Sequence, residues 1–115
     1  MQKIITEKIG EKVIVLVQGS VDATDARLSR RISSPQENGR KLYVWIDCSS
    51  MQGIKTHGLC HFINQLLLMK SYGVQIILLN ANTKQRQVFS ALQLEHLFTF
   101  VPDFEKAYQL VQASS

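Results

Sequence analysis

The sequence predicts an α/β fold with a mixed, mainly parallel central sheet, helices packed against it, and the order β-β-α-β-α-β-α-β-α. Three observations favour this fold. Runs of β-branched and aromatic residues alternate with segments whose apolar residues recur at helical spacing. The runs 42–46 and 74–79 are almost entirely apolar, which is typical of strands covered on both faces. The chain shows no internal repeat or linker, so its 115 residues are expected to form one domain, 1–115.

The first two strands are expected to add an antiparallel edge to the sheet. Residues 3–7 are β-prone, and the run 13–17 has the β-branched content of a buried strand. Gly10-Glu11-Lys12 supplies a polar turn between them, and Gly19 ends the second strand.

A first helix is predicted from Asp25 to about Ser33. Thr24 is its expected N-cap, and Asp25 lies at the positive end of its dipole. Pro35 stops this helix, and residues 33–39 have the composition of a loop.

A second helix is predicted over residues 56–72, where apolar residues form one continuous face. Gly73 follows at the position of a C′ glycine. The third helix begins at a cap, Asn82 or Thr83, and extends to about Leu92. The inward side chains expected on these two helices are Leu59, Phe62, Ile63, Leu66, Leu67, Val88, Phe89 and Leu92.

The last two elements are a short strand, residues 97–101, and a terminal helix that Asp103 caps and that extends through Val111. These two elements complete an alternation of strands and helices along the chain, and this alternation predicts a largely parallel sheet.

Composition and charge exclude several classes of protein. The 13 Lys and Arg residues exceed the 9 Asp and Glu residues by only four and are dispersed, so direct nucleic-acid binding is not expected. The apolar runs are far shorter than the roughly 18 residues that span a bilayer, and residues 1–10 lack a signal-peptide core. We therefore expect a cytoplasmic protein without membrane insertion, in which Cys48 and Cys60 are reduced thiols.

Catalytic and metal-binding motifs find little support. The sequence contains no glycine-rich phosphate loop and no nucleophile elbow. His57 and His61 have the i, i+4 spacing of a metal pair, but Gly58 follows the first histidine where metalloproteases have Glu, and the spacing indicates no third ligand. The expectation is a protein that is not an enzyme and that has no catalytic residue, cofactor or metal.

The junction from Ile46 to Leu59 is the most informative segment. A central strand ends there, a loop follows, and the second helix begins with the hydroxyl residue Thr56. The unpaired N–H groups and the dipole at a helix start would stabilise a phosphate on Thr56, which makes it a candidate for a phosphorylation switch. The alternative is that Thr56 only caps the helix.

Basic residues suggest a second kind of site. The densest stretch consists of Arg27, Arg30 and Arg31 on the first helix, with Arg40 and Lys41 beyond the loop. It is either a solvated helix face or a docking surface for an acidic partner, because arginine binds carboxylates in bidentate fashion. Lys84 and Arg86 open the third helix and oppose its dipole, which indicates a binding role.

Several motifs, in this order and spacing, resemble those of the STAS domain, the fold of anti-sigma factor antagonists and of the cytoplasmic tails of sulphate transporters. Gly19-Ser20-Val21-Asp22 resembles the family's Gly-x-Leu/Ile-Asp, and the central strand 42–47 ends in Asp as the family's strand does. Ile54 to Leu59 occupies the place of a hydrophobic residue followed by Asp-Ser-Ser/Thr-Gly-Leu. Further matches are 73–79 and the apolar residues Val88, Phe89, Leu92, Leu94, Leu97 and Phe98.

The resemblance implies a phosphoacceptor and a docking surface. In anti-sigma factor antagonists, the hydroxyl residue after the motif aspartate accepts a phosphate from a partner kinase that is also the anti-sigma factor, and that position is Thr56. Lys55 stands where the family has Asp, and His57 where it has a second hydroxyl residue, while Gly58 is kept. Asp22 falls on the family's acidic position near the phosphate. The partner-binding residues that the resemblance implies are Asp22, Lys55, His57 and Gly58, and the charge at the start of the third helix adds Lys84 to them.

Three functions remain open on this reasoning. The first is a protein–protein regulatory module that resembles an anti-sigma factor antagonist, binds a serine-kinase-like ATPase and is switched at Thr56. The second is an unswitched STAS accessory subunit that docks a transporter subunit of a lipid- or anion-transport complex. The third is a small anion or nucleotide binder at the helix start near Thr56.

Overall fold

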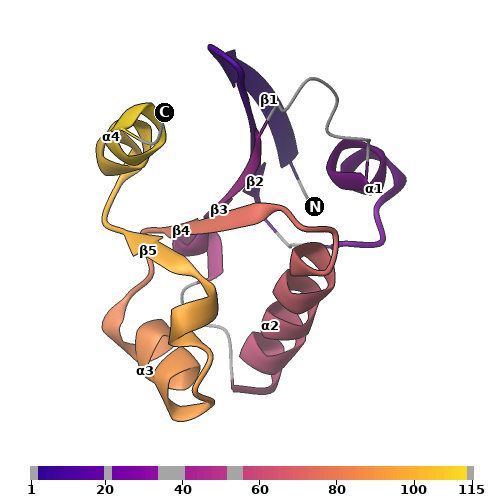
Figure 1. Ribbon diagram of the computed structural model, residues 1–115. Coiled ribbons are helices and arrows are strands. Elements are labelled where there is room, and N and C mark those ends of the chain that lie inside the picture. Colours follow the sequence, from indigo (N-terminus) through magenta and orange to yellow (C-terminus); the bar gives the residue numbers. More distant parts are fainter. Residues whose placement is uncertain (1–2, 20–21, 34–40, 52–55, 114–115) are drawn as a thin grey trace.

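The computed structural model describes residues 3–19, 22–33, 41–51 and 56–113 (Figure 1). Residues 34–39 of the predicted loop, Pro35 included, Arg40 of the basic stretch and Lys55 of the predicted site lie outside these ranges.

A five-stranded sheet with the strand order β1-β2-β3-β4-β5 forms the centre of the molecule. β1 (Lys3–Ile9) pairs antiparallel with β2 (Lys12–Gln18). β3 (Lys41–Asp47), β4 (Gln75–Leu79) and β5 (Thr99–Val101) continue the sheet in parallel. The mixed, mainly parallel sheet is confirmed, and β2, β3 and β4 occupy its interior as predicted.

The β1–β2 connection is a two-residue turn. Gly10 has a φ of +60°, which suits the first central position of a type II′ turn. Ile9 and Lys12 are the pair that flanks the turn, and from there the register runs without a bulge to Lys3 opposite Gln18.

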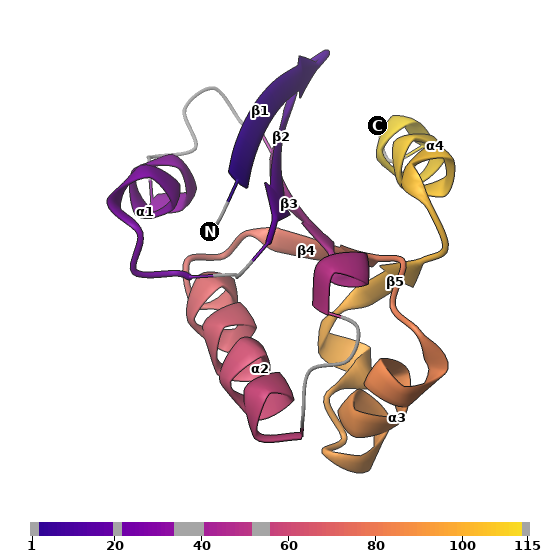
Figure 2. The same ribbon diagram turned by 180° about the vertical axis from the view of Figure 1, so that it is seen from behind.

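Helices cover both faces of the sheet (Figures 1 and 2). α1 (Ala26–Ser33), α2 (Thr56–Lys70) and α3 (Thr83–Ala91) pack on one face, and α4 (Phe104–Ala113) packs on the other. This arrangement follows from the parallel connections, because each crossover must place its helix on a face of the sheet.

The main core lies between the sheet and the first three helices. Leu59, Phe62, Ile63 and Leu66 are buried in it as the helical periodicity predicts, together with Phe89 of α3. Leu67 and Val88 pack against this core but are only partly buried.

A second, smaller core lies beneath α4. Trp45 of β3 packs edge-on against Tyr108 at a centroid distance of 4.9 Å and also contacts Phe104. The indole Nε1 is buried and has no hydrogen-bond partner among the described residues. Lys12 Nζ and Tyr108 Oη donate to the Val111 carbonyl and the Glu7 carboxylate, which fixes α4 to the hairpin.

Three details of the prediction were wrong. Asp25, not Thr24, caps α1, because its carboxylate accepts the Arg27 amide and its carbonyl accepts the Ser29 amide. Leu92 lies just past the end of α3 and is 49% exposed. The last strand is shorter than predicted because residues 95–97 form a 3₁₀ turn.

The other caps agree with the prediction. Asn82 caps α3 in a capping box with Gln85, and the Asp103 carboxylate accepts the Lys106 amide at the start of α4. Gly73 follows α2 with a φ of +82°, which glycine adopts without the penalty that a Cβ would add.

Candidate functional site

The candidate site lies at the edge of the sheet where the parallel strands β2, β3 and β4 end. The segments that follow these strands lead to the starts of α1, α2 and α3. In open parallel sheets this edge is the usual place for binding, because loops from several strands converge there. The predicted site residues Asp22, Thr56 and Lys84 all follow one of these three strands.

Asp47, the last residue of β3, joins the ends of the three strands. Its carboxylate accepts hydrogen bonds from Gln18 Nε2 of β2 at 3.1 Å and from Asn80 Nδ2, directly after β4, at 3.2 Å. It also accepts the Ser49 amide at 3.0 Å and the Ser49 hydroxyl at 2.6 Å. The carboxylate therefore fixes both the strand ends and the 3₁₀ turn Cys48–Met51 that leads toward α2.

The hydrogen bonds determine the charge state of Asp47. Burial by itself would raise the pKa of this carboxyl group, but the donors from Ser49, Asn80 and Gln18 outweigh burial and hold the pKa below its ordinary value. Asp47 is therefore a carboxylate at neutral pH. Its lone pairs are engaged in the network, so it is suited to positioning the turn rather than to proton transfer.

Asn80 has a backbone conformation that suits its role. Its φ of +60° places it in the left-handed region, which asparagine tolerates better than most residues. The backbone N–H of Asn80 donates to the Val101 carbonyl at 3.3 Å, and its side-chain Nδ2 donates to the Asp47 carboxylate. One residue thus connects β3, β4 and β5 at the edge that carries the site.

Gln85 connects α3 to the turn after β3. Its side chain is buried, accepts the Asn82 amide in the capping box and donates to the Cys48 carbonyl at 3.2 Å. Burial, together with the Asp47 charge, raises the pKa of the Cys48 thiol to about 12. Cys48 is consequently a neutral core residue, whereas Cys60 is exposed on α2.

Gln65 connects α2 to the segment before α1. Its buried Oε1 accepts the Ala23 amide at 2.8 Å, so Asp22 and Ala23 lie beside the third turn of α2. Nine residues separate Gln65 from Thr56, which is about 13.5 Å along a helix axis. The structure thus places Asp22 away from the first turn of α2, although the resemblance implies an acidic residue near the phosphate.

The predicted site residues have different local surroundings. Asp22 is exposed, and its carboxylate accepts the Thr24 amide at 2.9 Å and the Thr24 hydroxyl at 2.6 Å. Thr56 and His57 are the first residues of α2, with side chains outside the described part of the structure, and Gly58 follows half-buried. Lys84 is exposed in the first turn of α3.

Basic side chains lie on both helices that flank α2. Arg27, Arg30 and Arg31 are exposed on α1, where Arg27 pairs with Asp25 at 3.2 Å. On α3, the Arg86 guanidinium lies 5.2 Å from the centroid of the Phe100 ring. It lines a cavity of about 320 Å³ whose other lining residues are Ala81, Phe100, Val101 and Pro102.

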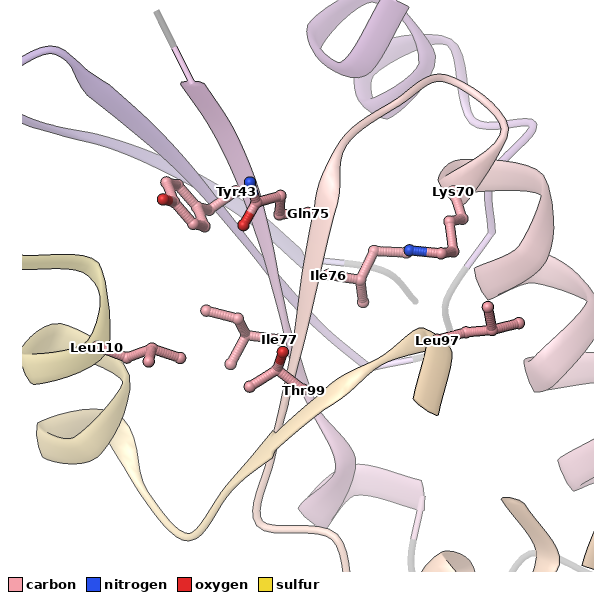
Figure 3. A pocket seen from close by; sticks show the side chains of 8 residues that line it. All are labelled: Tyr43, Lys70, Gln75, Ile76, Ile77, Leu97, Thr99 and Leu110. Carbon is pink, nitrogen blue, oxygen red and sulfur yellow. The ribbon is translucent and has the colours of Figure 1, made fainter. Parts of the chain in front are cut away.

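A second cavity, also of about 320 Å³, lies at the opposite edge, beside the first residues of β4 (Figure 3). Tyr43, Ile77 and Leu110 point into it from the side of α4, and Lys70, Ile76 and Leu97 lie on the other side of β4. Gln75 and Thr99 complete the lining. Asp22, Gly58 and Lys84, the predicted site residues whose surroundings the structure describes, do not line this cavity.

Sequence reasoning missed the amides that organise the site: Gln18, Gln65, Asn80 and Gln85. Gln65 carried a signal, because it lies on the apolar face of the second helix, three residues after Phe62. A polar residue at such a position needs a buried partner. Gln85 carried another signal, as the third residue after a capping Asn.

The described residues form neither a cluster of metal ligands nor a membrane-spanning helix. No three of their His, Cys, Asp and Glu side chains are grouped so that they could hold a metal ion. No helix formed by these residues is long and apolar enough to cross a membrane.

Comparisons with known proteins agree with this architecture. A family model for the STAS domain matches residues 3–107, whereas a search of curated protein sequences gave no significant match. A crystal structure of a Thermotoga maritima protein assigned as an anti-sigma factor antagonist is 16% identical, with a TM-score of 0.56, over 95% of this chain and 94% of that chain. The phosphorylated form of the Bacillus cell-fate determinant SpoIIAA is 19% identical, with a TM-score of 0.53, over 95% of this chain and 99% of that chain. Similarity at these identities shows a shared fold.

Proposed function

The chain belongs to the STAS domain family, and we propose that it is a regulatory module that docks reversibly to a protein partner and is controlled by phosphorylation of Thr56. In this proposal it resembles an anti-sigma factor antagonist, is not an enzyme and works in the cytoplasm. Its partner is an anti-sigma factor of the serine-kinase-like ATPase type.

The observation that carries the proposal is the position of Thr56 as the first residue of α2. A phosphate at this position lies next to unpaired backbone N–H groups and the positive end of the helix dipole. The first turn of α2 contains no acidic residue that would repel it. A chain of this fold that places a hydroxyl residue there is suited to accept a phosphate.

Rigid anchoring of the preceding turn supports the same proposal. Asp47 holds Ser49 in place, and Gln85 holds the Cys48 carbonyl, so the turn is fixed to both the sheet and α3. The ends of β2 and β3 and the start of α3 therefore form one defined surface at this edge of the sheet. Because phosphorylation adds about 1.5 to 2 negative charges at neutral pH, its main effect is electrostatic.

The surrounding charge favours an acidic partner. Arg27, Arg30 and Arg31 on α1 and Lys84 and Arg86 on α3 are exposed. The two helices that carry them lie on either side of α2 (Figures 1 and 2). A phosphate on Thr56 would lower the net positive charge of the domain and repel carboxylates of a partner bound near the start of α2. Phosphorylation is therefore expected to weaken docking and increase its dissociation rate.

Lys55 changes the electrostatic interaction between residue 55 and a phosphate on Thr56. Two unit charges about 4 Å apart interact with roughly 4 kcal/mol at an effective dielectric near 20. Lys55 would attract a phosphate on the neighbouring Thr56, whereas the family's Asp would repel it. The phosphate is thus better tolerated within the domain than in relatives with Asp. A kinase that requires the acidic residue would not recognise the site.

Site mapping tests the proposed modification. Protein isolated from native cells, or incubated with its copurifying kinase and ATP, should gain one phosphate on Thr56 by intact-protein mass spectrometry. Thr56→Ala should abolish the gain. Thr83→Ala is the matched control, because Thr83 is also the first residue of a helix and is exposed, and it should leave the phosphate in place.

The lysine at position 55 and the histidine at position 57 favour a second function, because they replace the acidic and hydroxyl residues of the phosphorylation motif. In it, the chain is an unswitched accessory subunit of a membrane transport complex for lipids or anions. Thr56→Ala would then leave partner association and transport intact, and no phosphate would be found under any growth condition. The copurifying protein would be a transporter subunit.

A further inference from the structure

Among the strands that the described residues form, none pairs with the outer edge of β1. β1 is seven residues long and ends the sheet on one side, whereas β5, the strand at the other end, has three residues (Figures 1 and 2). A long edge strand presents a row of unpaired backbone groups, and proteins usually protect such an edge with a bulge, a proline, charged side chains or a covering segment. The charged residues of β1 are Lys3, Glu7 and Lys8, which are of both signs, so they oppose pairing only in registers that bring like charges together. β1 pairs with β2 through a continuous register and contains no proline.

The hairpin turn determines which backbone groups point outward. In a two-residue hairpin the residues that flank the turn are hydrogen-bonded to each other, here Ile9 and Lys12. Hydrogen-bonded and non-hydrogen-bonded pairs then alternate along an antiparallel ladder. The N–H and C=O groups of Ile4, Thr6 and Lys8 therefore point away from β2.

The side chains of Lys3, Ile5 and Glu7 lie on the face of the sheet that α4 covers. Ile5 is paired with Leu16, which packs in the core beneath α4, and Glu7 accepts the Tyr108 hydroxyl. Ile5 is nevertheless 42% exposed, and Lys3 and Glu7 are exposed on either side of it. An apolar residue with a positive and a negative neighbour at equal spacing is complementary to itself when reversed.

We propose that β1 pairs antiparallel with β1 of a second copy of this chain, about a two-fold axis at Ile5. Ile5 then faces Ile5 of the second copy, and Lys3 of each copy faces Glu7 of the other. Ile4 and Thr6 of each copy exchange backbone hydrogen bonds with Thr6 and Ile4 of the other. Ile5 and the two ion pairs occupy non-hydrogen-bonded positions, where Cα atoms are about 4.5 Å apart and side chains are closest.

The outward N–H and C=O groups of Ile4, Thr6 and Lys8 allow several registers, and the charges of Lys3 and Glu7 favour this one. A shift by two residues places Lys3 opposite Ile5, or Ile5 opposite Glu7, and loses both ion pairs. A further shift places Glu7 opposite Glu7, which is unfavourable. The pairing joins two sheets into one of ten strands by an isologous contact, and it does not depend on the proposed switch at Thr56.

Charge reversal tests the pairing by sedimentation equilibrium at low salt. The wild-type chain should form a concentration-dependent dimer, and Lys3→Glu or Glu7→Lys alone should weaken it at least about tenfold, or about 1.4 kcal/mol, because each reversal makes two cross-strand pairs repulsive. An equimolar mixture of the two variants should restore the dimer, since the two acidic side chains of one variant then face the two basic side chains of the other. The variant that carries both substitutions should also dimerise.

Two controls separate pairing from loss of structure. Tyr108→Phe removes the hydroxyl bound to Glu7 and should leave the dimer intact. Circular dichroism should show that both single variants remain folded. A wild-type chain that is monomeric at about 1 mM would overturn the proposal. So would a dimer that the charge reversals do not weaken, or one that the mixture of variants does not restore.

Discussion

Replacement of Asp47 is the sharpest test of how the candidate site is held together. Its carboxylate accepts four hydrogen bonds from three residues. Asp47→Ala leaves these donors without their acceptor. Ser49 is exposed and recovers its hydrogen bonds from water, whereas Gln18 and Asn80 are half-buried and recover them only in part. At about 1–2 kcal/mol for each of these two donors, the expected loss in the free energy of unfolding is about 2–4 kcal/mol.

Asp47→Asn should have a smaller effect. The Asn side-chain oxygen can still accept from Ser49 and Asn80, and only the charge and the oxygen that faces Gln18 are lost. The expected loss is about 1 kcal/mol. Asp103→Asn is the matched control at the start of α4, where Asn caps as well as Asp, so the free energy of unfolding should hardly change.

Urea unfolding followed by circular dichroism measures these differences, and its pH dependence tests their cause. The pKa of Asp47 is lowered in the folded state below its ordinary value of 3.8. The stabilisation is therefore complete above that value and lost as the pH falls through the lower, folded-state pKa. The difference between wild type and Asp47→Asn should be constant from neutral pH down to about 5 and should shrink below about 4. A loss under about 0.5 kcal/mol for Asp47→Ala, or a pH-independent difference for Asp47→Asn, would refute the reasoning.

Three further predictions concern the core, the thiols and the docking surface. Phe62→Ala should lower the free energy of unfolding by about 3–5 kcal/mol, because Phe62 is only 2% exposed, whereas Leu68→Ala on the same helix, 49% exposed, should lower it by less than about 1 kcal/mol; equal losses in urea would contradict the core assignment. At neutral pH a thiol reagent should label Cys60 in the folded protein and Cys48 only after unfolding, as mass spectrometry of the labelled peptides would show, because burial keeps Cys48 protonated; rapid labelling of Cys48 would count against its burial. Lys55→Asp should weaken binding to an acidic partner and reduce its salt dependence in calorimetry, and unchanged values would place Lys55 outside the interface.

The fold was predictable because its strongest determinants are local. The apolar runs of β2, β3 and β4 and the periodic face of α2 favour one secondary structure each, and their alternation favours a parallel sheet. Element ends were less predictable, because adjacent polar residues compete for the same role. Thr24 and Asp25 can both cap a helix, and only the folded backbone shows that the Asp25 carboxylate accepts a hydrogen bond from the Arg27 amide in the first turn of α1.

The candidate site was predictable only in part. Thr56 and Lys84 could be placed near helix starts, since hydroxyl and charged residues that follow a strand have local meaning. The network around Asp47 depends on Gln18 and Asn80, which lie 29 and 33 residues away in the chain. The sequence around an Asn or Gln does not indicate which distant residue its side chain will contact. The contacts of Gln18 and Asn80 with Asp47 could therefore be identified only from the tertiary structure.

The distance between Asp22 and the start of α2 shows the same limit. The motif around Asp22 resembles the family's, which implies a place beside the phosphorylated residue. The contact between Gln65 and Ala23 instead sets Asp22 beside the third turn of α2. The sequence shows that Asp22 follows β2. Which turn of α2 lies beside Asp22 depends on how α2 packs against the sheet, and this is a property of the tertiary structure.

The central claim, a docking surface controlled at Thr56, is tested most directly by calorimetric titration of the copurified partner with two forms of this chain. One form carries a single phosphate mapped to Thr56, and the other is unmodified. Control at Thr56 requires that the phosphorylated form bind at least about tenfold more weakly, and that Thr56→Ala, exposed to the same kinase, keep the affinity of the unmodified form. Equal affinities of the phosphorylated and unmodified forms would contradict it.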